Sequence, residues 1–511
     1  TQGVSSAASD VYKRQVGVTA AFPVAVFVGI FIMLPVGNIF IDSIRWDSFT
    51  HVIDDTRIHH VLWITWWQAA WSTVLALTIG IPLAAVLAHH RFKGKRVVAT
   101  AFSMPFVLPT VVVALAALGL SGGSHPLMVI ILTHAYFNVS VVVRVVRAHL
   151  ATTVTIFENV AATLGAGPFT RLRTVDISLA RRSITQAAAL VFVFCVTSFG
   201  VVRIVGGLAD TTTEVEIYVR AIQLGDMSTA AVLAAIQIVF LVAIFAVFRS
   251  AGRQPRTQAA GTEYRRTLST TGRSSMWLAG ALFTAPIFVI LVKSLRARGI
   301  WTLAGWRGLD TAIMSNSIRF AVATAMISAS LAVALVVATA HAGCASRVIH
   351  AVASLPVVVS SIVLSVGIVA TFNRGWYDFR GSWWLLPVMH ATFALPVCFR
   401  TLRGHIENLT DDHRDAAATL GSSPLRTVTT IDIGSLRPAL VPIAAMAACI
   451  SLGEFGASSV LTRNNTRTLP LEITRLLGRP GDINQLQAHA LATILMVAVA
   501  VLLLIFGERN A

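Results

Sequence analysis

The sequence predicts an all-α, polytopic membrane protein of about twelve transmembrane helices, arranged as two parallel repeats of six. Its composition is the first reason, because 55% of the 511 residues are hydrophobic and only 12% are charged. Soluble domains are about 45–50% apolar and about 25% charged. The second reason is a series of long apolar runs, since a helix that crosses a bilayer needs roughly 20 apolar residues. These features exclude an ordinary soluble enzyme.

Twelve apolar runs follow one another along the chain, six on each side of a polar stretch. They lie near residues 16–40, 61–88, 97–120, 127–147, 184–208 and 229–248, and then near 276–295, 316–340, 348–371, 383–402, 438–461 and 487–507. We therefore divide the chain into a first half at 16–248, a basic linker at 249–275 and a second half at 276–511. Residues 1–15 match neither a signal peptide nor the rest of the chain. We assign them no function, and one interpretation is a segment that is not native.

Loop charge predicts the orientation. Residues 89–96 hold four Lys or Arg and no acid, and the linker holds six Arg against one Glu. Residues 41–60 and 209–228 hold more acids than bases. Basic loops stay in the cytoplasm, so both termini are predicted to be cytoplasmic. In the second half residues 293–315 are basic although parity puts them outside, and there we follow parity. The net charge of +17 is thus attributed to loops, and no nucleic-acid partner is expected.

An internal repeat at a shift of 256 residues runs through about ninety residues without a gap. An even number of predicted spans separates the copies, so the halves are parallel and related by an axis along the membrane normal. Such a pseudo-dimer implies a central pathway between two similar halves. The matched pairs include His134 and His390, Gly165 and Gly421, Asp176 and Asp432, and Phe199 and Phe455.

Each half carries a long cytoplasmic loop, near 157–180 and 413–436, with small residues and Leu at helical spacing before a glycine. This pattern predicts a short helix along the inner face that ends in a left-handed turn. Because both copies share one shift, we expect the helices to dock in a partner's groove rather than to be mere surface helices. The residues predicted for this role are Asn159, Ala161, Ala162, Gly165, Val175 and Ile177 in the first loop, and Asp415, Ala416, Ala417, Gly421, Ile431 and Ile433 in the second.

At these loops the chain resembles the permease subunits of ATP-binding-cassette (ABC) importers, whose loop reads Glu-Ala-Ala, three residues, Gly, nine residues, Ile, any residue, Leu-Pro. Asp415, Ala416, Ala417 and Gly421 fit the second copy, with Asp for Glu, and Gly434 replaces the proline. In the first copy Asn159 replaces Glu and Ser178 replaces Pro. The fused twelve-span form resembles the thiamine permease and its ferric-iron relatives, through stretches such as Gly453-Glu454-Phe455-Gly456 and Thr211-Thr212-Thr213-Glu214.

The resemblance implies a type I importer fold in a bacterial inner membrane, with lipid around it. It also implies an ATPase homodimer beneath the chain and an extracytoplasmic substrate-binding protein that delivers the cargo. The chain has no phosphate-binding loop of the G-x-x-x-x-G-K-[ST] type. We therefore expect it to be no enzyme, with no cofactor or metal of its own, and expect ATP and Mg²⁺ to bind the partner ATPase.

Glu454 is the most interesting ionisable residue within a predicted span, because such residues are costly there and are functional candidates. Its counterpart in the first copy is Ser198, so the pathway would be electrically asymmetric and would favour a cationic cargo. Phe455 and Gly456 belong to the same candidate pathway or gate. The alternative for Glu454 is a structural hydrogen bond between helices. For His134 and His390, which repeat in both halves, we expect a packing role.

Three functions remain open at this point. The favoured one is an ATP-driven importer permease for thiamine or a related small cation, in which ATPase closure drives alternating access. A ferric-iron permease of the same family would keep that mechanism. An ion-coupled secondary transporter also uses six-plus-six parallel repeats. It would need an ion-coupling site within the spans, and the paired docking loops favour the importer.

Overall fold

A computed structural model describes residues 16–43, 46–151, 155–207, 210–250, 266–341, 346, 349–350, 353, 355–357, 359–372, 379, 382–406 and 411–506. Within these residues ten helices are long and apolar enough to cross a membrane. They are Val16–Ile41, α4 (Thr56–His89), α7 (Pro126–His149), Pro168–Val196, Met227–Ala246, α14 (Thr270–Leu295), α15 (Thr311–His341), α18 (Leu385–Ile406), Val428–Gly453 and Asp482–Ile505. The predicted all-α polytopic fold is confirmed.

The other two predicted runs are not simple spans. The run at 97–120 forms helices α5 (Lys95–Val107) and α6 (Thr110–Ser121), whose axes differ by 97° at a break. Pro109 lies in this break, and proline supplies no backbone N–H to continue a helix. The run at 348–371 yields a shorter apolar helix, α17 (Ser361–Phe372). Hydropathy does not distinguish one straight helix from two short ones joined at an angle.

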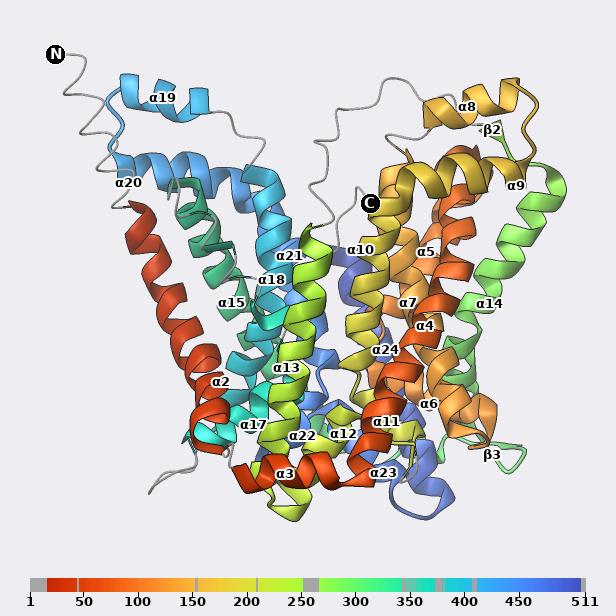
Figure 1. The fold of residues 1–511 in the computed structure, drawn as a ribbon, viewed down its shortest axis with the longest axis vertical. Coiled ribbons are helices and arrows are strands. Elements are labelled where there is room, and N and C mark those ends of the chain that lie inside the picture. The colour runs from red at the N-terminus through yellow and green to blue at the C-terminus, as the bar shows by residue number, and fades with distance from the viewer. Residues whose placement is uncertain are drawn as a thin grey trace.

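The short elements gather at the two ends of the helix bundle (Figure 1). One end, here called the docking face, carries both predicted docking loops. It holds α8 (Thr155–Thr163), α9 (Pro168–Arg171), α19 (Asp411–Thr419) and α20 (Pro424–Thr427). The opposite face holds α3 (Trp46–Asp54), α12 (Thr213–Tyr218), α23 (Leu469–Leu477) and the pair β3 (Arg296–Ala297) and β4 (Ile300–Trp301). Strands β3 and β4 belong to the basic segment 293–315. This segment therefore lies on the face opposite the docking loops, as the count of predicted spans requires.

Several spans continue through π-helical turns or end in short helices. Val16–Ile41 includes η1 (Gly29–Met33) and α2 (Leu34–Asn38) and leads to η2 (Ile39–Ser43). The fifth span includes η4 (Leu172–Asp176) and α10 (Ile177–Val196), and the eleventh includes η10 (Val428–Asp432) and α21 (Ile433–Gly453). The remaining elements are α11 (Gly200–Val205), η5 (Val219–Leu224), α13 (Met227–Ser250), η6 (Ala304–Trp306), η8 (Leu355–Val357), α22 (Gly456–Leu461), η11 (Asn464–Thr466) and α24 (Asp482–Phe506).

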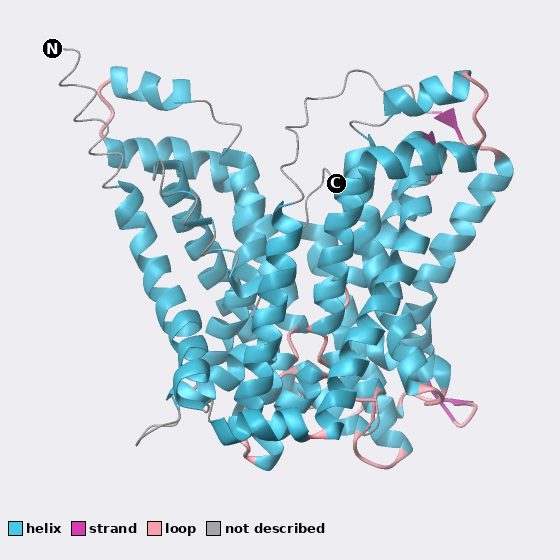
Figure 2. Ribbon diagram, in the orientation of Figure 1, coloured by secondary structure: helices cyan, strands magenta, loops and turns pink. Residues whose placement is uncertain are grey.

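Most of the predicted linker, 251–265, lies outside the described residues. The described part begins with strand β2 (Arg266–Thr267), which pairs in parallel with β1 (His90–Arg91) at the docking face. Helix α14 then starts at Thr270, so the linker is shorter than the predicted 249–275. The N-cap of α14 is Ser269, whose hydroxyl accepts a hydrogen bond from the amide of Gly272 at 3.1 Å. Among the described residues, the strands form two short pairs, β1 with β2 and β3 with β4 (Figure 2).

The two halves interlock. Each half is built around three helices that pack together. These are α4, α7 and α10 in the first half and α15, α18 and α21 in the second. The first span of each half packs against the other half, because α2 contacts α17 and α14 contacts α5 and α6. On the opposite face α12 contacts α17 and α23 contacts α6. The halves are therefore joined near that face and also along α14, which contacts α5 as well as α6. Helices α9 and α20 lie on opposite sides of the molecule (Figure 1).

Candidate functional site

The first docking loop is built around helix α8 and the turn that follows it. Gly165 has φ +84°, a conformation in which an L-residue with a side chain is strained. The Gly165 amide donates to the carbonyl of Ala162, and the Ala166 amide donates to that of Ala161, each at 3.0 Å. This is the Schellman arrangement that satisfies the last carbonyls of a helix. Asn159, Ala161 and Ala162 all lie on α8.

The second docking loop repeats this construction. Gly421 follows α19 with φ +75°, and the Ser422 amide donates to the carbonyl of Ala417 at 3.0 Å. The carbonyl of Ala416 accepts from the Leu420 amide at 3.1 Å. Asp415 lies on the same helix. The left-handed turns predicted at both glycines are therefore present, and their docking role stays a prediction.

Two leucines that sequence reasoning did not select project from these loops. The side chains of Leu164 and Leu420 are 81% and 87% exposed, and they occupy the same position of the repeat, just before the glycine. Their recurrence at one position of the repeat makes them candidates for contact with the partner that the docking loops predict. The available signal was their 256-residue spacing. The other predicted residues lie where each loop joins its span: Val175 in η4, Ile177 at the start of α10, Ile431 in η10 and Ile433 at the start of α21.

The candidate gate lies at two helix breaks in the middle of the molecule. Helix α10 ends at Val196 and α11 begins at Gly200, while α21 ends at Gly453 and α22 begins at Gly456. The runs 184–208 and 438–461, predicted as single spans, are therefore each interrupted. Ser198 and Glu454 lie within the breaks at equivalent positions, and both are partly exposed.

Close packing at the breaks explains why they contain glycine. A Cβ on Gly200 would lie 2.7 Å from the hydroxyl of Thr110, which begins α6. A Cβ on Gly456 would collide with the hydroxyl of Ser361, which begins α17. Each broken span thus meets the start of a neighbouring helix with no room for a side chain. Phe199 and Phe455 are both about 5% exposed or less and stack on each other across the halves.

Glu454 acts as a cap in this structure. One of its carboxylate oxygens accepts a hydrogen bond from the Ala457 amide at 2.9 Å, at the start of α22. A negative charge at a helix N-terminus is favourable. The structural alternative for Glu454 is therefore realised. Its counterpart Ser198 is bonded to His134 at 2.8 Å.

The repeated histidines bridge helices within each half. In the first half the His134 ring bonds Gln68 and Ser198, both at 2.8 Å. In the second half the His390 ring bonds Ser451 at 2.8 Å and Ser458 at 3.3 Å. Both rings are buried and use both nitrogens, which agrees with the predicted packing role. They fix the helix breaks against α7 and α18.

Glu214 is a buried acid that sequence reasoning did not select as a site residue. It lies on α12 and has no exposed surface. One carboxylate oxygen accepts a hydrogen bond from the Gln237 side chain at 2.5 Å. Its α12 contacts α17 of the other half, so this acid lies close to the junction between the halves. The sequence pattern around Glu214 does not distinguish a buried acid from an acid in an exposed outer loop.

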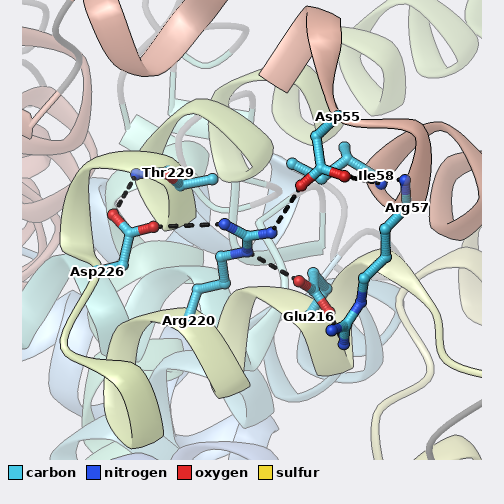
Figure 3. Close-up of polar contacts among 7 residues, drawn as sticks. All are labelled: Asp55, Arg57, Ile58, Glu216, Arg220, Asp226 and Thr229. Atoms are coloured by element: carbon cyan, nitrogen blue, oxygen red, sulfur yellow. Dashed lines mark hydrogen bonds and ion pairs between the residues drawn. The ribbon is translucent and has the colours of Figure 1, made fainter. Parts of the chain in front are cut away.

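An ion-pair network fixes the opposite face (Figure 3). The Arg220 guanidinium lies between Glu216 at 2.8 Å, Asp55 at 3.2 Å and Asp226 at 3.4 Å. Arg57 pairs with Glu216 at 3.4 Å. Burial alone would raise the pKa of Asp55, but the amides of the next turn and Arg220 outweigh it and lower that pKa. The network ties the start of α4 to α12 and α13.

The sequence is similar to that of known transport proteins. Residues 330–509 match the family described as binding-protein-dependent transport system inner membrane component. The thiamine transport system permease protein of Brucella melitensis is 28% identical over 490 residues, which cover 89% of each chain. The protein of that name from Escherichia coli is 24% identical over 471 residues, or 84% of this chain and 86% of the relative. A probable ABC transporter permease protein of Sinorhizobium fredii is 21% identical over 511 residues, with 91% and 90% covered.

These matches cover both halves, the docking loops and the helix breaks. The chain is therefore similar to fused permease subunits over most of its length, as the sequence motifs predict. The relatives carry the names of transport proteins and not of enzymes.

Proposed function

We propose that this chain, whose residues 330–509 match the family of binding-protein-dependent transport system inner membrane components, is the membrane-spanning subunit of an ATP-driven importer for thiamine or a related small cation. The ATPase is a separate homodimer that holds ATP and Mg²⁺. A substrate-binding protein outside the membrane delivers the cargo. The chain itself forms the pathway and performs no covalent chemistry.

The duplicated docking loops are the observation that carries this proposal. Two equal subunits of an ATPase dimer require two equal contact surfaces, and the chain offers α8 and α19 at one face of the molecule. Each ends in a glycine turn and exposes a leucine at the same repeat position. This face is the cytoplasmic one in the proposal, in agreement with the basic loop 89–96. The protein then resides in a bacterial inner membrane.

The contacts between the halves support the proposal of alternating access. Contacts between the halves include the stacked Phe199 and Phe455 and the packing of α12 on α17 and of α23 on α6. We infer that this arrangement is closed toward the opposite face. ATPase closure would draw the two docking loops together, and rigid movement of the halves would separate the phenylalanine rings. Release of the ATP products would restore the closed gate.

The cargo assignment rests on the names of the relatives and on charge. Glu454 places a carboxylate beside the gate, and the aromatic rings next to it suit a flat organic cation. Ferric iron, which we consider as the other cargo, would need several hard oxygen ligands. Thiamine is therefore the cargo to test first.

Uptake of labelled thiamine into proteoliposomes tests the proposal. The vesicles hold this chain with its ATPase and binding protein, with or without ATP inside, and with ferric iron as a competitor. We expect uptake that depends on ATP and is indifferent to iron. Uptake of iron in place of thiamine would change the cargo and keep the mechanism. Uptake that ignores ATP and follows an ion gradient would refute the importer.

A further inference from the structure

The repeated aspartates Asp176 and Asp432 are not used by the mechanism so far. We propose that Asp432, held by Arg414 and His341, is the joint through which the second docking loop moves the gate, and that the first half has a weaker form of this joint. The inference rests on the proposed function and names positioning residues for it. None of the three lies in the helix breaks at 197–199 and 454–455 that form the candidate gate.

A single buried carboxylate joins three elements in the second half. Asp432 ends η10 and has no exposed surface. One of its oxygens accepts from Nε of Arg414 on α19 at 2.9 Å. The other lies 2.8 Å from Nε2 of His341, the last residue of α15. The docking helix, the end of a transmembrane helix and the start of α21 are thus tied at one point.

Helix α21 connects this point to the gate. It runs for 21 residues from Ile433 to Gly453, which is about 30 Å at 1.5 Å per residue, and Phe455 lies two residues beyond its end. Separating a buried carboxylate from its partners leaves an uncompensated charge, which is strongly unfavourable. A movement of α19 is therefore passed to α21 instead of being lost in the loop. The π-helical turn η10, a form frequent at functional sites, sets the carboxylate at the joint.

The first half has the same histidine–aspartate pair as the second half, but it has no arginine at the position of Arg414. Asp176 ends η4 and lies 3.1 Å from Nε2 of His89, the last residue of α4, and both side chains are about 5% exposed or less. The position that corresponds to Arg414 is occupied by Glu158, and an acid there supplies no guanidinium to Asp176. Among the described residues, the histidine–aspartate pair is thus present in both halves, and an ion pair between the aspartate and an arginine is present in the second. We infer that the second docking loop is the more rigidly coupled of the two.

The ratio of ATP hydrolysed to thiamine transported tests this joint in the complete complex. Arg414→Ala removes the guanidinium from a side chain that is 11% exposed, and Arg414→Lys retains the charge. The matched control is Arg298→Ala, which removes an exposed ion pair of 2.6 Å with Asp482 on the opposite face. Copurification with the ATPase and the melting temperature are measured for each variant.

We expect Arg414→Ala to bind the ATPase and to hydrolyse several-fold more ATP per thiamine. Arg414→Lys should restore most of the coupling, and Arg298→Ala should match the unchanged chain. An unaltered ratio in Arg414→Ala would overturn the inference. Loss of ATPase binding in that variant would also overturn it, because the side chain would then build the docking surface. If the unchanged chain transports nothing with ATP, the proposed function fails instead, and the two failures are distinguishable.

Discussion

The rings of Phe199 and Phe455 stack with 5.3 Å between their centroids and 30° between their planes, although 256 residues separate them in the chain. The two residues hold the same position in the two repeats. Equivalent residues contact each other only at the axis that relates the repeats, so this axis passes between the rings. Gly453 lies against Pro109 of the other half at the same place. The two halves are therefore in contact where both spans are broken, and in the proposed mechanism this contact closes the pathway.

Truncation of either ring should loosen the closed gate. An aromatic pair contributes about 0.5–1.5 kcal/mol beyond the area it buries, and each 1.4 kcal/mol is a tenfold change in an equilibrium. We expect Phe455→Ala to raise ATP-independent leak of thiamine through the chain by up to about tenfold. Leak is measured as efflux from loaded proteoliposomes without ATP.

A lipid-side phenylalanine is the control for this experiment. Phe22 is 68% exposed on the first span, so Phe22→Ala removes a ring of the same size away from the axis. It should leave efflux unchanged. Equal leak in Phe22→Ala and Phe455→Ala would mean that membrane packing, and not the ring stack, controls the pathway.

Substitution of the two turn glycines should weaken the docking loops. Gly165 and Gly421 have φ of +84° and +75°, and no atom lies within 4 Å of a Cβ built on either. The cost of Gly165→Ala or Gly421→Ala is therefore conformational, about 1–2 kcal/mol, and it falls on the end of the docking helix. We expect lower ATPase binding and lower transport with little change in the melting temperature, measured by copurification and thermal unfolding.

The matched control is Gly404→Ala. Gly404 lies within helix α18, has an ordinary φ, and also has open space around a built Cβ. Alanine there favours the helix, so binding and transport should persist. Intact transport in both loop variants, with normal expression, would contradict ATPase docking at these loops.

The two roles of Glu454 can be separated by two substitutions. Glu454→Gln retains an oxygen that can accept from the Ala457 amide, whereas Glu454→Ala removes the cap and should cost about 0.5–2 kcal/mol. We expect the glutamine variant to melt near the unchanged chain and still to take up thiamine more slowly, because the charge beside the gate is gone. Normal uptake by Glu454→Gln would restrict this residue to capping α22.

Hydropathy and the internal repeat predict most of the fold because both can be read from the residues of each segment alone. Hydropathy locates the spans, and the 256-residue shift pairs Gly165 with Gly421 and Phe199 with Phe455. What it misses are the breaks at 197–199 and 454–455 and the bend at Pro109. An apolar residue that faces lipid and one that packs at a break have the same hydropathy. Ten of the twelve predicted runs contain a span-length helix among the described residues, and hydropathy does not predict where a run is broken or bent.

The site shows the same division. The sequence locates Gly165 and Gly421, because a left-handed turn at the end of a helix usually requires glycine. It does not locate the partners of Asp176 and Asp432, because His89 and His341 are 87 and 91 residues away from them in the chain. Glu214 is missed for the same reason, since Gln237 reaches it from the next helix. Contacts between helices depend on packing that no single-chain pattern records.

The Arg220 network on the opposite face predicts a pH dependence of stability. Burial alone would raise the pKa of Asp226, but bonds from Thr229 and the Arg220 guanidinium outweigh it and lower that pKa below the ordinary 3.8, and the pKa of Asp55 is lowered as well. A carboxylate whose pKa is lower in the folded state stabilises the protein above its unfolded pKa. This contribution is lost as the pH falls through the folded pKa.

Arg220→Met removes the centre of the network and leaves its acceptors unpaired, which should cost roughly 1–3 kcal/mol near neutral pH. The difference in melting temperature from the unchanged chain should be largest there and should begin to shrink as the pH falls below the ordinary aspartate pKa of 3.8. It should shrink further as the pH falls through the lowered pKa values of the folded state, where Asp55 and Asp226 of the unchanged chain become protonated. Thermal unfolding in detergent across this range measures the difference. Arg298→Met, which removes an exposed ion pair, should shift melting little at any pH. A gap for Arg220→Met that stays constant into acid would mean that the side chain stabilises this face by packing, with no contribution from the two aspartates.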